Sequence, residues 1–173
     1  MPMTMSWGRW RPEAAKSIWK RAKPPFRLGK KKKPRDIKAW SEKLSKDLEN
    51  IPTTRGLIEH PKFQRALEGL RLQNLPPEDL VIYLKSDDIF VAMLSLHLAA
   101  ERDDLDQEAV RSSVFFHITY PSTHRTVAAL QCLPQIIEGP CIGPVIAAIY
   151  NRWNDFQIDK ALRRLVDECL ANG

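Results

Sequence analysis

Apolar residues that recur three or four positions apart are the feature that most limits what this chain can fold into. Beyond residue 35 they form one stripe after another, and each stripe is typical of the buried face of an amphipathic helix. The first stripe contains Ile37, Trp40, Leu44 and Leu48, separated by lysines and glutamates. Only seven of the 173 residues are glycine, which disfavours most all-β architectures. The sequence therefore predicts an all-α fold.

Residues that start and stop helices divide these stripes into short elements. An aspartate or serine before a stripe can cap the free amides of a first turn, and a proline disfavours helical geometry at the residue before it. The expected helix starts are Asp36, Pro77, Asp87 or Asp88, Asp106, Ser122, and Asn154 or Asp155, with further helices after Pro61 and near Ile142. They predict eight short helices joined by loops of two to five residues. The stripe over 89–100 is apolar on nearly every side and predicts a central, buried helix.

One segment could also form a strand. Residues 114–119 are β-branched and aromatic in composition, which favours extended backbone. No other segment alternates apolar and polar residues, so a strand here would have no partner. We therefore expect this segment to be helical.

Part of the helical pattern returns after a regular interval. The pattern that begins at Asp88 recurs thirty-four residues later at Ser122, and one leucine pair recurs after another thirty-two. The residues concerned are Met93, Leu96 and Ala99, then Val127, Leu130 and Leu133, and then Leu162 and Leu165. Such a period is typical of solenoid repeats, and residues 78–171 resemble HEAT or armadillo repeats. The resemblance implies helix hairpins stacked as a short α-solenoid whose concave face binds another protein. An irregular helical bundle is the alternative that the spacing leaves open.

Charge is distributed unevenly along the chain. Residues 1–40 contain thirteen lysines or arginines and two acidic residues, whereas the rest of the chain contains fourteen and nineteen. The net charge of +6 therefore combines a strongly basic leader with a weakly acidic body. This predicts a basic N-terminal arm at 1–35 and an all-α helical domain at 36–173. Such an arm is typical of contact with a polyanion or an acidic protein surface, although it could also fold back onto its own body.

The arm contains the residues that we expect to bind a partner. Six cations within nine positions repel one another and favour an extended chain, and tryptophan is favoured at protein interfaces. The predicted partner-binding residues are Trp7, Trp10, Trp19, Arg27, Lys30, Lys31, Lys32, Lys33 and Arg35. A solvated tail seldom carries three tryptophans, so we expect the arm to contact another protein or a larger assembly.

Taken together, these features predict a non-enzymatic protein–protein interaction module or adaptor. Its helical body would present a binding face, and its basic arm would dock to a larger assembly. The alternative is a nucleic-acid-binding protein, in which the cations of the arm meet phosphates and its tryptophans stack on bases. The acidic body argues against this alternative because it repels the same phosphates. A basic helix with tryptophans could also lie on an anionic membrane surface.

The sequence contains no clear motif for catalysis or for binding a cofactor or metal. It has no GxGxxG, no P-loop and no GxSxG turn, and the spacing of its histidines and cysteines fits no zinc site. His97 and His117 lie among apolar residues and are expected to be hydrogen-bonded core side chains. Cys132 and Cys141 are expected to be small core hydrophobes. We therefore expect no catalytic residue, cofactor or metal, although a site assembled from distant residues is a third possibility.

The cellular compartment follows from three features of the sequence. Residues 1–38 contain no continuous apolar segment, which argues against a secretory signal. No run approaches the eighteen apolar residues that a membrane-spanning helix needs. The three cysteines, Cys132, Cys141 and Cys169, are an odd number, which points to free thiols in a reducing compartment. We therefore expect a cytoplasmic protein.

Overall fold

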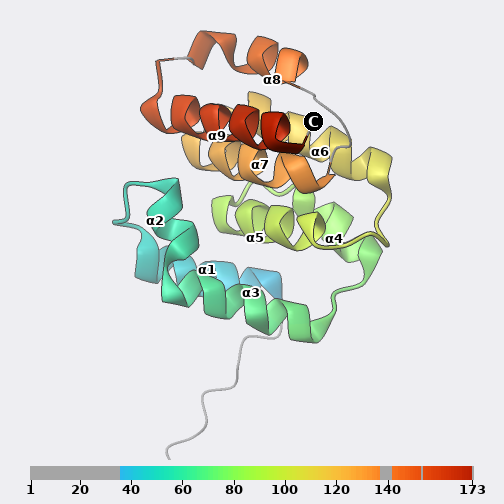
Figure 1. Ribbon diagram of the computed structural model, residues 1–173. Coiled ribbons are helices and arrows are strands. Elements are labelled where there is room, and N and C mark those ends of the chain that lie inside the picture. Colours follow the sequence, from blue (N-terminus) through green and yellow to red (C-terminus); the bar gives the residue numbers. More distant parts are fainter. Residues whose placement is uncertain (1–35, 137–141, 153, 173) are drawn as a thin grey trace, which may run out of the picture. The chain divides into compact units, whose positions relative to one another are not determined.

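The computed structural model describes residues 36–136, 142–152 and 154–172, and in these ranges helices are joined by short turns and loops (Figure 1). The helices are α1 (Ile37–Leu48), α2 (Thr54–Glu59), α3 (Pro61–Gln73), α4 (Pro77–Leu84), α5 (Ile89–Ala100), α6 (Gln107–Thr119), α7 (Thr123–Ile136), α8 (Ile142–Ile149), the 3₁₀ helix η1 (Tyr150–Arg152) and α9 (Phe156–Asn172). The described ranges contain no strand, and the prediction of an all-α fold is confirmed. The segment 114–119, which could have formed a strand, belongs to α6.

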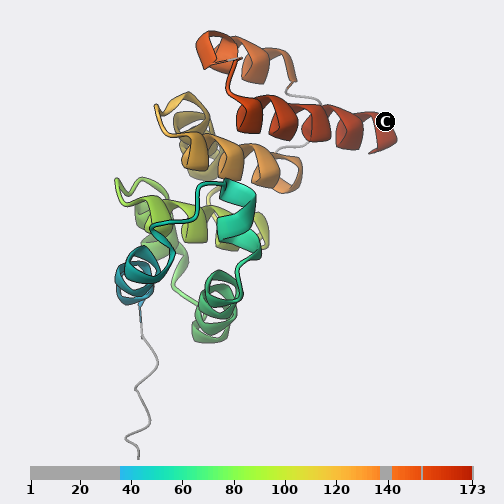
Figure 2. The same ribbon diagram turned by 90° about the vertical axis from the view of Figure 1, so that its left-hand side faces the viewer.

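Alternate helices stack on one another, so that the chain forms two rows (Figures 1 and 2). In one row α4 contacts α6, and α6 contacts α8. In the other row α3 contacts α5, α5 contacts α7, and α7 contacts α9. Helix α1 packs against α3 and α5, and the short helix α2 packs against α3 and α7. This arrangement places α5 and α7 in the middle of the stack.

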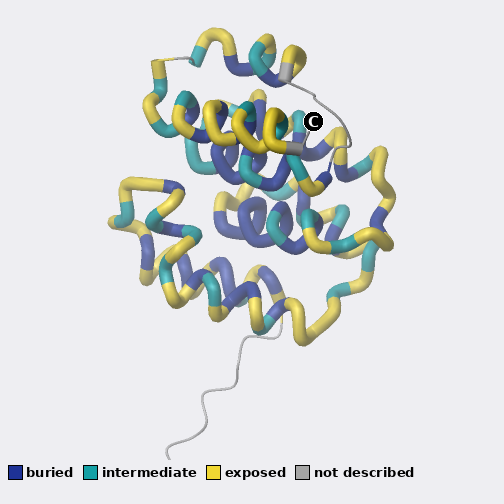
Figure 3. The backbone as a smooth tube through the Cα atoms, in the orientation of Figure 1, coloured by how far each residue is buried: buried dark blue, intermediate teal, exposed yellow. Residues whose placement is uncertain are grey.

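Helix α5 forms the centre of the core, as its apolar sequence predicts. Nine of its twelve residues are buried, and the tube is almost continuously dark along it (Figure 3). Its buried polar residue, Ser95, donates a hydrogen bond from its hydroxyl to the carbonyl of Val91 at 2.6 Å. A buried hydroxyl that returns to its own helix in this way is itself satisfied without a partner on another element.

Aspartate caps start several of the helices at the predicted positions. The Asp36 carboxylate accepts from the amide of Ala39 at 2.6 Å. Asp88, Asp106 and Asp155 accept from amides in the first turns of α5, α6 and α9 in the same way. Helix α3 ends at Asn74, which adopts the left-handed conformation with φ of 46°. Asparagine tolerates this conformation better than most residues, which lets Asn74 end the helix.

Helix α2 is absent from the prediction. Thr53 caps it by accepting from the amide of Gly56 at 3.1 Å, and only Thr54 and Leu57 are buried in it. Two buried positions in six residues make no apolar stripe, so helical periodicity cannot reveal the element. The segment is helical because Thr53 caps it and because it packs against α7.

Both ends of α9 carry exposed apolar side chains. Phe156 and Leu170 are 75% and 76% exposed. Helix α9 has seventeen residues, α7 has fourteen, and α9 extends past α7 in Figure 2. Ile158, Ala161 and Leu165 are buried where α9 packs on α7, and the C-terminal end of α9 is the end that extends past α7.

Candidate protein-binding groove

The partner-binding residues predicted from the sequence lie in residues 1–35, outside the described part of the chain. They are Trp7, Trp10, Trp19, Arg27, Lys30, Lys31, Lys32, Lys33 and Arg35, and Cys141 also lies outside the described residues. The arm, its boundaries and its role stay predictions. The described helices nevertheless form a surface site that the sequence did not indicate.

A groove lies where α2, α7 and α9 meet, and these elements are adjacent in Figure 2. Its cavity volume is about 180 Å³. The lining residues are Thr53, Arg55, Val127, Gln131, Phe156, Gln157, Lys160, Ala161 and Arg164. They come from three segments that are far apart in the sequence, so the groove exists only in the folded chain.

The floor of this groove is apolar. Val127 on α7 and Ala161 on α9 are 4% and 7% exposed, and they close the groove against the core. Phe156, the first residue of α9, is 75% exposed at its edge. An exposed phenylalanine beside an apolar depression offers a partner a large hydrophobic surface to cover.

The charged residues of the groove are all cations. Arg55 contributes from α2, and Lys160 and Arg164 contribute from consecutive turns of α9. Arg55 forms an exposed ion pair with Glu59 at 2.5 Å, and the Lys160 ammonium lies 5.9 Å from the centre of the Phe156 ring. Arg164 has no ion-pair partner among the described residues. The groove therefore carries a positive charge that the described fold compensates only in part.

Hydrogen bonds from Gln157 hold α2 at the edge of the groove. The Gln157 side-chain oxygen accepts from the amide of Thr54 at 2.9 Å, and its amide group donates to the carbonyl of Pro52 at 3.4 Å. On the α7 side, the Thr54 hydroxyl and the His124 Nδ1 are 2.8 Å apart. These contacts join residues seventy or more positions apart and hold α2, which carries Arg55, beside α9.

Asp155 fixes the start of α9 and therefore the position of Phe156. It accepts from the Thr123 hydroxyl at 2.6 Å and from the amides of Gln157 and Ile158 at 2.9 and 3.3 Å. Burial opposes its ionisation, but these hydrogen bonds and the charge of Arg152 outweigh burial and lower the pKa of Asp155. The carboxylate is therefore ionised at neutral pH and holds α9 against α7.

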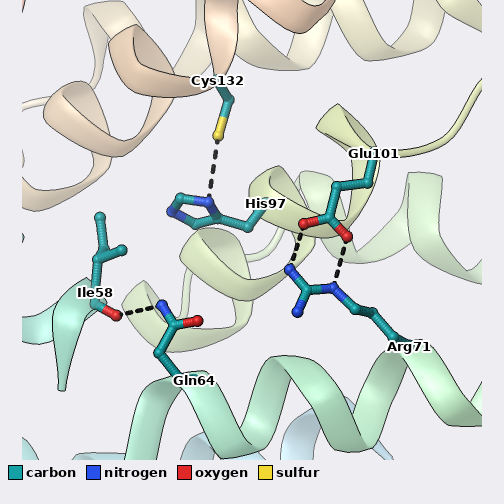
Figure 4. A network of polar contacts seen from close by, with 6 residues as sticks. All are labelled: Ile58, Gln64, Arg71, His97, Glu101 and Cys132. Carbon is teal, nitrogen blue, oxygen red and sulfur yellow. Dashed lines mark hydrogen bonds and ion pairs between the residues drawn. The ribbon is translucent and has the colours of Figure 1, made fainter. Parts of the chain in front are cut away.

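The polar contacts near the centre of the stack are structural (Figure 4). Arg71 on α3 makes an ion pair with Glu101 at the end of α5. The Gln64 amide group donates to the carbonyl of Ile58 at 2.7 Å and so ties α3 to α2. These contacts join neighbouring elements, and none of them lines the groove.

Figure 4 also shows a thiol beside an imidazole, the arrangement from which a nucleophile and its base could be built. The Cys132 Sγ is 3.8 Å from the His97 Nδ1. Burial raises the pKa of the Cys132 thiol to about 12 and lowers the pKa of His97 to about 4. Both groups are neutral at pH 7, whereas a reactive cysteine is a thiolate. The contact is therefore one of core packing, as expected for both residues.

His117 also takes the core position predicted for it. Its side chain is fully buried, and its Nε2 is 2.5 Å from the carbonyl oxygen of Leu84. Burial lowers the pKa of His117, so the ring is neutral at pH 7 and donates from Nε2 to this carbonyl. The hydrogen bond ties α6 to the end of α4 and leaves no base directed at a cavity.

Two other depressions are wider, and part of their charge is paired within the fold. One lies between α1, α2 and the start of α5, where Asp88 caps α5 and also accepts from the Ser41 hydroxyl at 2.6 Å. The other lies between α8 and α9, where Asp159 pairs with Arg163 at 2.9 Å. Of these three depressions, only the groove of α2, α7 and α9 combines a largely exposed phenylalanine with cations that are incompletely paired.

Comparisons with protein-family models, with curated proteins and with solved structures find no match for this chain. In the described ranges, no group of three or more histidine, cysteine, aspartate or glutamate side chains could hold a metal ion. No described helix is both long and apolar enough to cross a bilayer. The geometry of the groove is therefore the main guide to function.

Proposed function

We propose that this protein is a protein–protein interaction module whose helical body presents the groove of α2, α7 and α9 to a partner. The observation that carries the proposal is the exposed ring of Phe156 beside an apolar floor and a set of cations. Aromatic residues and arginine are the side chains most enriched at interface hot spots. The basic arm predicted at 1–35 supplies a second contact, through which the module docks to a larger assembly.

The stacking of the helices supports a short α-solenoid of the HEAT or armadillo kind. Helices α5, α7 and α9 follow one another in a single row and begin at Ile89, Thr123 and Phe156. The residues before them, Asp88, Ser122 and Asp155, stand at corresponding places in this row. Solenoids of this kind bind other proteins on the extended surfaces that successive hairpins form.

The size of the groove favours a partner side chain over a small-molecule substrate. Sites for compact ligands and cofactors generally have volumes of about 300–1,000 Å³. The groove, at about 180 Å³, is smaller than this range and suits one large side chain of a bound segment. Because the buried thiol and imidazole are both neutral, they lend no support to a catalytic reading.

Selection of short peptides on the full-length chain tests this proposal. We expect a family of peptides whose affinity falls about tenfold in the Phe156→Ala variant, because the ring contributes a large apolar contact. The matched control is Leu170→Ala, since Leu170 lies on the same helix, is equally exposed and does not line the groove. Fluorescence anisotropy measures each affinity. Peptides that bind all three proteins equally would show that the groove is not the binding face.

A further inference from the structure

The charges around the groove identify the kind of partner that fits it. We propose that its occupant is an acidic protein segment, in which one large apolar side chain is flanked by aspartates or glutamates. This inference rests on the proposed function and adds the chemistry of the partner. It depends on the floor, the cations and their spacing.

The floor accepts a single apolar anchor. Val127 and Ala161 are small side chains at the base of a cavity of about 180 Å³, and Phe156 forms one edge. An aromatic anchor seated there would cover the Phe156 ring and remove apolar surface from water, which is the main source of affinity in such contacts. The groove has no acidic lining residue that would repel carboxylates beside the anchor.

The cations stand on two sides of the anchor position. Lys160 and Arg164 are four residues apart on α9, so their side chains lie on the same face, roughly 6 Å apart at their β-carbons. Arg55 faces them from α2. A segment that crosses the groove can therefore place carboxylates toward α9 on one side of its anchor and toward α2 on the other.

We expect these cations to determine which partners bind more than how tightly they bind. Single exposed ion pairs contribute about 0–1 kcal/mol, so they add little to affinity one at a time. Complementary charge instead raises the association rate and excludes partners of the wrong sign. A lysine-rich segment would meet three cations, of which only Arg55 forms an ion pair among the described residues, and it would be rejected even if its anchor fitted the floor.

Three labelled peptides that share a central tryptophan test the inference. Their flanks are glutamate, serine or lysine, and their binding to the full-length chain is measured by fluorescence anisotropy at low and at physiological salt. We expect the glutamate peptide to bind about tenfold more tightly than the serine peptide, and the lysine peptide to show no binding. The basic arm also attracts acidic peptides, so the contribution of the groove is measured by the difference between variants.

The decisive variant reverses the charge on α9. In Lys160→Glu/Arg164→Glu, we expect the preference to shift from the glutamate peptide to the lysine peptide. The matched control, Arg65→Glu/Arg111→Glu, changes the net charge equally at exposed residues of α3 and α6 and should leave the preference unchanged. Circular dichroism checks that both variants are folded.

The possible failures are distinguishable. If the glutamate preference is equal in the wild type and in the α9 reversal, the groove does not select acidic segments and the inference is wrong. If the serine peptide binds as tightly as the glutamate peptide, and Phe156→Ala weakens both, the inference is wrong while the proposed function survives. If Phe156→Ala lowers the affinity of none of the peptides, the proposed function itself is wrong. Full displacement of the glutamate peptide from the groove by a short oligonucleotide would assign the cations to phosphate and overturn the inference.

Discussion

At the scale of single residues, Arg125 is the side chain whose environment is most unusual. It is 1% exposed, and its guanidinium lies 4.1 Å from the centre of the Tyr120 ring. Its Nε and Nη1 have no hydrogen-bond partner in the described chain, and no described carboxylate pairs with it. A buried cation without an anion is expected to destabilise the folded state, although the aromatic ring offsets part of the penalty.

Replacing this arginine by a hydrophobic residue should therefore do little harm. We expect Arg125→Met to leave the free energy of unfolding unchanged or to raise it by about 1 kcal/mol. The contrasting variant is Arg152→Met, because Arg152 donates to the Tyr120 carbonyl at 2.5 Å and to the Thr126 hydroxyl at 2.6 Å. We expect that variant to lose about 1–3 kcal/mol. Urea denaturation measures both, and a larger loss in Arg125→Met than in Arg152→Met would contradict this account.

The stability of the fold should depend on pH through His97. Burial lowers the pKa of His97 in the folded chain to about 4, whereas an unfolded histidine has a pKa of 6.5. Between these two values the unfolded chain binds more protons, so stability is fully present above pH 6.5 and is lost as the pH falls toward 4. The loss through this group is on the order of 3 kcal/mol.

The pH dependence is measurable as the free energy of unfolding at a series of pH values between 7 and 4. We expect His97→Gln to show a shallower decline than the wild type, because one of the groups that takes up a proton on unfolding has been removed. His117 and His124 also have a pKa lowered by burial, so part of the decline should persist. Identical slopes in both proteins would show that His97 does not titrate as proposed.

At the scale of helices, α2 shows how a short element can be held by its neighbours. Its six residues bury few side chains, and it is attached to α9 through Gln157 and to α7 through the contact between Thr54 and His124. Isolated helices of this length are not stable, because nucleation is unfavourable. The position of α2, and with it one side of the groove, therefore depends on these tertiary contacts.

Removing the Gln157 side chain should release α2. In Gln157→Ala the buried amide of Thr54 loses its acceptor, so we expect stability to fall by about 1–2 kcal/mol. Hydrogen exchange of the α2 amides should accelerate, because local opening becomes easier. Gln131→Ala is the control, since Gln131 lines the same groove but its side chain makes no hydrogen bond to another described residue. Equal exchange rates in the two variants would refute the role given to Gln157.

The helices that the sequence predicts are those with a cap and an apolar stripe of their own. Asp36 before Ile37 and Asp88 before α5 are local signals, so both starts could be read directly. Neither α2 nor the exposure of Phe156 could be read in this way. Phe156 continues the apolar stripe of α9, yet its ring is 75% exposed in the folded chain.

The sequence does not predict the groove, for a related reason. Arg55, Gln131 and Lys160 have no relation in the sequence, and they meet only because α2, α7 and α9 pack together. Two cations four residues apart on α9 are typical of any solvated helix face. Only their position beside an apolar floor separates them from such a face, and that position is a property of the tertiary structure.

At the scale of the whole described stack, successive hairpins make contact mainly with their neighbours, with α5 and α7 in the middle. The groove is an exception, because it joins residues near the start of this stack to its last helix. The hydrogen bond between Thr54 and Gln157 spans 103 positions of the chain. A ligand bound there would hold these distant segments together and increase resistance to unfolding.

This long-range closure has a consequence for synthesis and turnover. A nascent chain on the ribosome has no groove until α9 has emerged, so the contact proposed for the groove cannot form before then. A chain that proteolysis has shortened before α9 loses Phe156, Lys160 and Arg164 together. Under the proposed function, binding through the groove is thus confined to chains that retain α9.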